Sequence, residues 1–317
     1  MMNLSPETHH LIPSAATIGC FDGVHRGHQM LVKMMVCQAR QRGLKPIAVT
    51  FDRLPRQLFD PTFRPQVLST LDEKTACLKN LGVEEVVVLP FTHELAALSA
   101  EAFMREILRG QLSVKLLVTG YDNRFGHDRN EGFEDYVRYG QALGIEVVRG
   151  DVAMMDNQEA VSSTAIRQLL AEEGRVERMT DVLTRRYALT GRVVTGEHIG
   201  HALGFPTANL EPDSQDKLIP ASGAYAVWAI VDGNRMPAMM NIGTRPTFEG
   251  KQQTLEVHIL NDVGNLYGQT MTVEFVSRLR AEQRFDTREA LIAQLEQDRR
   301  TTESVLFNTT TIKTIKI

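Results

Sequence analysis

The feature that most constrains this chain is a change in its residue pattern near position 183. Before that point, short β-branched segments alternate with segments of helical periodicity, which predicts an α/β fold with a doubly wound parallel sheet. After it, apolar and polar residues alternate as in antiparallel strands, which predicts a small β-barrel. A last helical pattern over 287–307 carries apolar residues at helical spacing, so we expect this helix to pack on the barrel.

The elements can be placed by this periodicity. The predicted strands of the first half span 15–19, 46–51, 85–89, 115–119 and 145–149, and the helices between them span 28–42, 70–81 and a segment that begins after Ser99. The predicted strands of the second half span 187–195, 223–231, 238–242, 254–260 and 270–276. The 317 residues fit two domains at about 150 residues each, and we place these at 1–183 and 184–317.

Composition narrows the possible partners. Hydrophobic residues make up 43% of the chain and charged residues 23%, as in globular proteins, so a disordered or collagen-like chain is excluded. The formal net charge is -4, so the chain lacks the excess of basic residues that nucleic-acid binding normally needs. We therefore expect small-molecule substrates and no nucleic acid, while the oligomeric state is left open.

Cysteine usage and hydropathy indicate a compartment. Cys20, Cys37 and Cys77 form no CxxC pair and no partner set for a zinc site, as expected for a reduced, cytoplasmic protein. The segment 1–17 lacks a basic start and a long apolar run, and no later stretch reaches about 18 apolar residues. We expect neither export nor membrane insertion.

The strongest local motif is GCFDGVHRGH at 19–28, where a predicted strand turns into a predicted helix. Its glycines allow close backbone approach, and the helix start offers free amides and the positive end of its dipole. His25 and His28, three apart, can share one side of the turn. Histidines that only cap and pack are the alternative, but two of them in a glycine-rich turn favour a phosphate site. A zinc site lacks a third ligand at matching spacing.

Two further motifs follow. GYDNRFG at 120–126 comes after a predicted strand and should reach the same sheet edge. VSSTAIR at 161–167 places Ser162 or Ser163 where it can cap a helix, and its hydroxyls, amides and Arg167 suit a triphosphate. A serine run by itself is usually only a cap, so this prediction depends on the histidine turn.

In this order the three motifs resemble the adenylyltransferase half of the bifunctional bacterial riboflavin kinase/FAD synthetase family. The resemblance implies a nucleotidylyltransferase-type, Rossmann-like domain that transfers AMP from ATP to the phosphate of FMN and releases pyrophosphate. It implies that His25, His28 and Arg167, with Mg²⁺, stabilise the charge that grows in the reaction. The residues it places at ATP or its phosphates are Gly19, Phe21, Asp22, Gly23, Asp122, Ser162, Ser163 and Thr164.

This half departs from the family pattern at two positions. Leu54 stands where members usually have the histidine of TFxPHP, and Asn123 replaces an aromatic residue. Both substitutions raise the possibility of a weaker adenylyltransferase.

In the second half, glycines are dense around 196–204, which indicates a loop that lies flat against a ligand; Gly196 and Gly204 are its candidates for contact with ATP. Thr207 and Asn209, two apart in an extended segment, point to one side and offer hard oxygen ligands suited to Mg²⁺. A Pro-Thr-Ala-Asn turn without a ligand is the alternative.

The segment GFPTAN at 204–209 resembles the signature of riboflavin kinases, and later blocks such as NIGTRPTF, LEVHI and LRAEQRF match in the family's order. The resemblance implies a six-stranded Greek-key barrel that phosphorylates riboflavin with ATP. It implies Glu256 as the base, Thr207 and Asn209 as Mg²⁺ ligands, and Arg280 near the flavin. His201 stands where arginine is common, so a phosphate contact there is expected to be weaker.

Three functions follow, in order of support: a bifunctional enzyme making FMN and then FAD, a kinase with an impaired or inactive adenylyltransferase domain, and a flavin-binding regulator without catalysis. The last predicts loss of Glu256, Thr207 or the histidines, and all of these are present.

Overall fold

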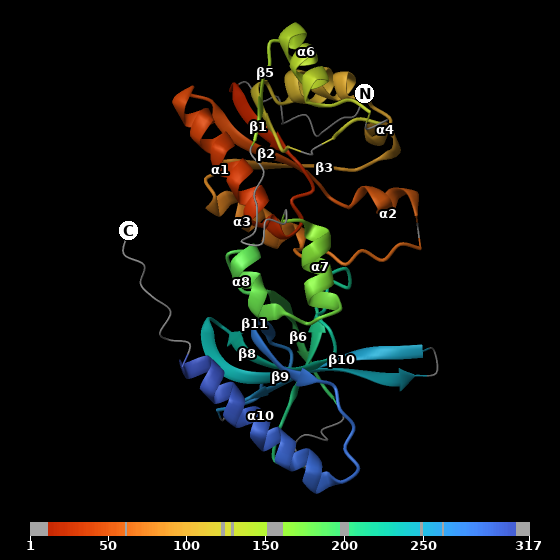
Figure 1. Cartoon of the computed structure of the whole chain (residues 1–317), viewed down its shortest axis with the longest axis vertical. Helices are drawn as coiled ribbons and strands as arrows, with labels where there is room; N and C mark the ends of the chain where they lie inside the picture. The colour runs from red at the N-terminus through yellow and green to blue at the C-terminus, as the bar shows by residue number, and fades with distance from the viewer. Residues whose placement is uncertain are drawn as a thin grey trace. The chain divides into compact units, whose positions relative to one another are not determined.

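The computed structural model describes residues 12–60, 62–121, 124–127, 130–150, 161–196, 203–247, 250–261 and 263–308. Its contacts divide the chain into two compact units, 1–163 and 164–317. Figure 1 shows the helix-flanked sheet of the first unit and the strand-rich second unit with its long last helix.

The first unit is built on a five-stranded parallel sheet in the order β3-β2-β1-β4-β5, with the first strand in the middle. The strands are β1 (Ser14–Ile18), β2 (Lys45–Phe51), β3 (Glu85–Leu89), β4 (Val114–Thr119) and β5 (Glu146–Arg149). Every residue of β1 is buried, because helices cover both faces of a doubly wound sheet. The order reverses beside β1, which is where such sheets bind ligands. The predicted fold of this half is therefore confirmed.

Helices and turns connect these strands. They are η1 (Asp22–Val24), α1 (Arg26–Gln41), α2 (Pro55–Phe59), α3 (Leu71–Asn80), α4 (His93–Ala96), α5 (Ala100–Phe103), the π-helical η2 (Met104–Gln111) and α6 (Phe133–Leu143). Side chains cap several of them. Ser99 Oγ accepts from the Ala102 amide at 3.2 Å, and Thr70 Oγ1 accepts from the Glu73 amide at 3.3 Å.

The second unit is a closed barrel in the order β10-β7-β6-β11-β8-β9. Its strands are β6 (Ala188–Val194), β7 (Ala208–Pro212), β8 (Gly223–Val231), β9 (Asn234–Thr247), β10 (Gly250–Ile259) and β11 (Thr270–Ala281). α10 (Arg288–Asn308) follows and contacts β8, β9 and β11, as predicted. β7 is a strand that the alternation pattern alone did not predict.

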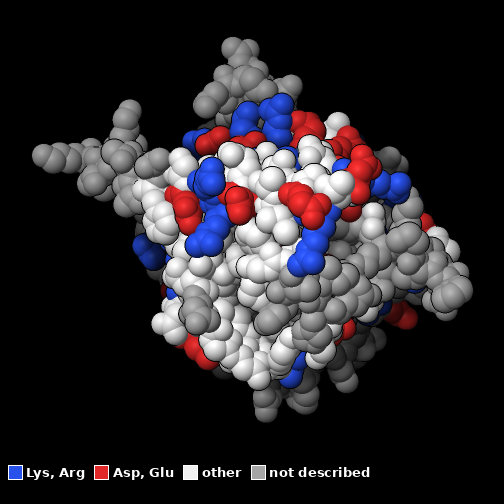
Figure 2. Space-filling view, turned by 90° about the horizontal axis from the view of Figure 1, so that it is seen from below, with Lys and Arg blue, Asp and Glu red and all other residues white. Residues whose placement is uncertain are grey.

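Alternation along the strands sets the two faces of the barrel. Leu255, Val257 and Ile259 of β10 are buried in the interior, so Glu256 and His258 lie on the outer face. On the face shown in Figure 2, the described acidic and basic side chains are interspersed. Within α10, Arg299 forms an ion pair with Glu303, and Arg300 forms one with Glu296.

The segment 164–183 packs with the barrel. It contains most of α7 (Ser163–Ala171), then η3 (Val176–Arg178) and α8 (Met179–Val182). Arg278 of β11 donates to the Glu173 carbonyl at 3.0 Å, and a Cβ at Gly174 would lie 2.7 Å from the Tyr225 hydroxyl. The contacts therefore divide the chain at 163, before the predicted boundary at 183. That the two activities are divided at 183 stays a prediction. None of the helices in the described ranges is long and apolar enough to cross a membrane.

Candidate functional site

The glycine-rich turn after β1 is sharply bent. Phe21, Gly23 and Val24 all have positive φ, at 48°, 79° and 41°, so the backbone reverses within four residues before α1 begins. A Cβ at Gly19 would lie 3.3 Å from the Phe21 ring, so glycine lets that ring lie across the end of β1. The turn thus places the N-terminus of α1, the positive end of its dipole, at the carboxyl edge of the sheet.

The two histidines of the turn lie against each other. Their rings stack at 3.7 Å between centroids, and the His25 Nδ1 accepts a 3.4 Å bond from the His28 amide at the start of α1. Burial, then the charges of His25 and Lys74, hold the pKa of His28 well below its ordinary value. His28 is therefore neutral at pH 7 and keeps one ring N–H as a hydrogen-bond donor, and its contact with phosphate stays a prediction.

Asp22 has a structural task in the turn. Its carboxylate accepts from the Leu68 amide at 2.8 Å and the Ser69 amide at 3.1 Å, and Ser69 Oγ accepts from the Gly23 amide at 2.9 Å. Ser163 Oγ donates to the Asp22 carbonyl at 3.0 Å. These bonds tie the turn to two distant segments, and the predicted contact of Asp22 with ATP stays a prediction.

A buried lysine that motif analysis missed supports the same turn. Lys74 is 8% exposed and donates to the Cys20 carbonyl at 3.0 Å and to the Phe51 carbonyl at 3.2 Å, where β1 and β2 end. Burial lowers the pKa of Lys74, and the charges of Cys20 and Asp22 oppose that shift. Its position on the buried face of α3 beside Leu78 was the available signal.

The second motif is described in part. Phe125 stacks on Tyr136 at 4.2 Å, and a Cβ at Gly126 would lie 2.6 Å from the Ala100 amide nitrogen, so both residues seat the motif on α5 and α6. Asp122 and Asn123 lie outside the described residues.

The remaining predicted residues of this half are only partly tested. Ser162 precedes α7. Thr164 and Arg167 belong to the second compact unit, and their approach to the histidines stays a prediction. The Leu54 amide donates to Gln57 Oε1 at 2.8 Å before α2, and nothing in the structure explains leucine at that position.

Strand register gathers the predicted residues of the barrel in one row. Glu256 of β10 pairs with Asn209 of β7 on one side and with Asn241 of β9 on the other. Asn241 pairs with Ala224 of β8, which pairs with Arg280 of β11. Residues directly opposite one another share a face of the sheet, so the predicted base and one predicted metal ligand are neighbours on the outer face.

The surroundings of Asn209 fit a metal ligand. A Cβ at Gly196 would lie 1.9 Å from Asn209 Nδ2 and 3.0 Å from its Oδ1, so glycine leaves space that the amide of Asn209 fills. Thr207, two residues earlier, borders both cavities of the barrel unit described below. A hydroxyl and an amide oxygen beside a carboxylate form a set of hard oxygen donors, as Mg²⁺ prefers. His201 lies outside the described residues.

Two cavities flank this row. The first has a volume of about 360 Å³ and lies between the outer face of the barrel and α10, with Asn241, Glu256 and Arg280 in its wall. The second, of about 380 Å³, includes Gly204, Thr207 and Tyr267. Thr207 and His258 border both, so ligands in the two cavities would meet at these residues.

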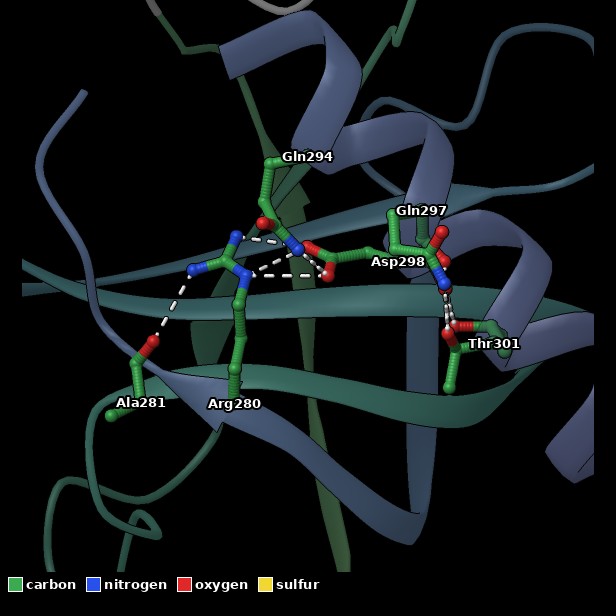
Figure 3. A network of polar contacts seen from close by, with 7 residues as sticks. Arg280, Ala281, Gln294, Gln297, Asp298 and Thr301 are labelled. Atoms are coloured by element: carbon green, nitrogen blue, oxygen red, sulfur yellow. Dashed lines mark hydrogen bonds and ion pairs between the residues drawn. The ribbon is translucent and has the colours of Figure 1, made fainter. Parts of the chain in front are cut away.

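Arg280 is held by a buried carboxylate that sequence analysis missed. Its Nε and Nη2 lie 2.9 Å and 2.8 Å from Oδ2 of Asp298 in α10, and Gln294 donates to Oδ1 of the same carboxylate at 2.8 Å (Figure 3). Asp298 is 5% exposed. The signal was an acid on the helix face of Leu291 and Leu295. Contact of Arg280 with flavin stays a prediction.

Comparison with known proteins identifies the family of each half. The family model described as FAD synthetase matches residues 7–165, and the one described as riboflavin kinase matches 183–306. The bifunctional riboflavin kinase/FMN adenylyltransferase of Escherichia coli K12 is 37% identical over 283 residues, covering 89% of each chain. The chain belongs to the bifunctional riboflavin kinase/FMN adenylyltransferase family.

Other members support this assignment. The family member from Pseudomonas fluorescens is 37% identical over 93% of each chain. A crystal structure described as a macrolide-efflux protein from Streptococcus pneumoniae superposes with a TM-score of 0.87 at 30% identity, covering 94% of this chain and 96% of that one. Both halves of the fold are thus shared along nearly the whole chain.

Proposed function

We propose that this chain makes FAD from riboflavin in two steps: the barrel unit phosphorylates riboflavin with ATP to give FMN, and the N-terminal unit adenylylates FMN with a second ATP and releases pyrophosphate. The two family matches and the bifunctional relatives support both activities. The observation that carries the kinase step is the register that pairs Asn209 with Glu256, which lies in the wall of the first cavity.

In the kinase step, Glu256 accepts the proton of the 5′-hydroxyl of the ribityl chain. The oxygen then attacks the γ-phosphorus of ATP, the bond from that phosphorus to the bridging oxygen breaks, and ADP leaves. In this proposal riboflavin binds in the first cavity, between the barrel and α10, and ATP binds in the second, so that the two meet at Thr207. Gly196 and Gly204 let the backbone approach the nucleotide.

Thr207 and Asn209 would hold Mg²⁺ through their side-chain oxygens. When bound, Mg²⁺ neutralises charge on the ATP phosphates. The contribution of the chain is to bring the two oxygens together, and Gly196 leaves the space that the amide of Asn209 fills.

In the adenylyltransferase step, a phosphate oxygen of FMN attacks the α-phosphorus of ATP and the bond to the bridging oxygen breaks, so pyrophosphate leaves. The attacking phosphate is already ionised, so no base is needed. Neutral His28 donates a hydrogen bond to the phosphates, and the positive end of the α1 dipole attracts the same anions. His25 orients His28 by stacking, and Arg167 supplies positive charge.

The substrates are small molecules, and the scarcity of cysteine supports action in the cytoplasm. The test is to incubate the purified protein with riboflavin, ATP and Mg²⁺ and to separate flavins by chromatography over time. FMN followed by FAD is expected. FMN alone would refute the adenylyltransferase step and direct attention to Leu54 and Asn123. No conversion of riboflavin would refute the kinase step, and failure to convert added FMN to FAD would refute the adenylyltransferase step.

A further inference from the structure

His258 connects the strand of the base to the segment of the metal ligands. It lies two residues after Glu256 on β10 and therefore on the same outer face. It is 8% exposed, and with Thr207 it borders both cavities. No part of the chemistry above uses this ring.

The contact of His258 falls on the backbone next to Thr207. Its Nδ1 lies 2.8 Å from the Pro206 carbonyl oxygen, and its ring packs edge-on against Phe205 at 5.2 Å. A carbonyl only accepts, so Nδ1 carries the proton and donates. Because this carbonyl belongs to the peptide unit that joins Pro206 to Thr207, the bond fixes the plane from which the Thr207 side chain extends.

We propose that His258 is a positioning residue of the kinase step: its Nδ1–H holds the Pro206–Thr207 peptide and so aims the Thr207 hydroxyl at the metal. The inference rests on the proposed function. It explains why a histidine occupies a buried position between two ligand cavities, since the same ring fixes the Thr207 segment relative to the strand of Glu256.

Near-isosteric variants separate the hydrogen bond from simple packing. His258→Asn keeps an amide N–H close to the place of Nδ1, His258→Gln carries its amide nearer to the place of Nε2, and His258→Leu has no donor. A shift of about 1 Å in a positioned group costs on the order of a hundredfold in rate. We expect the Gln and Leu variants to form FMN ten- to a hundredfold more slowly than wild type and to need more Mg²⁺. The Asn variant should form FMN at a rate within about threefold of wild type.

Two readouts do not depend on turnover. Amide hydrogen exchange of 203–209 in the metal-free protein should be faster in the Gln and Leu variants and like wild type in Asn. Calorimetric affinity for Mg²⁺ with ADP should weaken in the same order. The N-terminal unit should convert added FMN to FAD at the wild-type rate in all three variants, which serves as the control that this part of the protein is intact.

The outcomes are distinct. A Leu variant with wild-type rate, Mg²⁺ requirement and exchange would overturn the inference, as would an Asn variant that fails as badly as Leu while still converting FMN. If Leu does not fold, the comparison of Gln with Asn decides in the same way. A wild-type protein with no kinase activity would overturn the proposed function and this inference together.

Discussion

Replacing Gly196 by alanine tests the metal site with one methyl group. The added Cβ would lie 1.9 Å from Asn209 Nδ2 and 2.6 Å from its Cγ, whereas unstrained carbon contacts are about 3.5 Å or longer. The amide must retreat by roughly 1.5 Å, and it can do so because it ends a flexible side chain. Gly196 does not have the positive φ that would make alanine strained by itself.

The expected result is a selective loss of kinase function. A displacement of this size costs on the order of a hundredfold in rate, or about 2.7 kcal/mol in the activation barrier, at limiting Mg²⁺. The melting temperature should stay within a few degrees, and FMN-to-FAD conversion should be unchanged. The assay is initial-rate FMN formation across a Mg²⁺ titration.

Gly132→Ala is the matched control, because a Cβ at Gly132 has nothing within 4 Å and the residue lies in the other unit. It should form FMN at the wild-type rate. If Gly196→Ala also kept the wild-type rate and Mg²⁺ requirement, the argument that Asn209 holds the metal from this position would be refuted.

Three more outcomes are expected. Glu256→Gln should lower FMN formation by about 10² to 10⁴-fold in the chromatographic assay, since it removes a general base, and should spare FMN-to-FAD conversion. In urea denaturation, the wild-type unfolding free energy should fall as pH drops below about 6.5, because unfolded but not folded His28 binds a proton there, and His28→Asn should flatten that fall. Burial raises the pKa of Tyr225 to about 12, so stability should fall between about pH 10 and 12, where only the unfolded phenol ionises, and Tyr225→Phe should remove this loss.

Each of these has a contradicting result. Retained kinase turnover in Glu256→Gln would remove the assignment of the base. An unchanged acid limb in His28→Asn would mean that other groups dominate the pH dependence of stability. If stability still falls above pH 10 in Tyr225→Phe, another group causes that loss. The variant also loses the hydrogen bond to the Ala221 carbonyl, which should cost about 1 kcal/mol at neutral pH.

The sequence by itself determined the class of each half and the approximate places of most strands. The predicted strands 85–89 and 223–231 match β3 and β8, and the last predicted helix differs from α10 by one residue at each end. Periodicity and capping are local, so side chains within a few residues decide them. The motifs also indicated where the two candidate sites lie: GCFDGVHRGH marks the end of β1, and GFPTAN marks the segment around Thr207.

Only the tertiary structure decided which side chains meet. Asn209 and Glu256 are far apart in the chain, and their pairing depends on the register of β7 against β10, which no local pattern encodes. The ion pair of Arg280 with Asp298 and the two carbonyls that hold Lys74 are likewise contacts between distant segments. A buried charge needs such partners. A charged residue on an apolar helix face therefore indicates that a partner exists, but only the fold decides which residue the partner is.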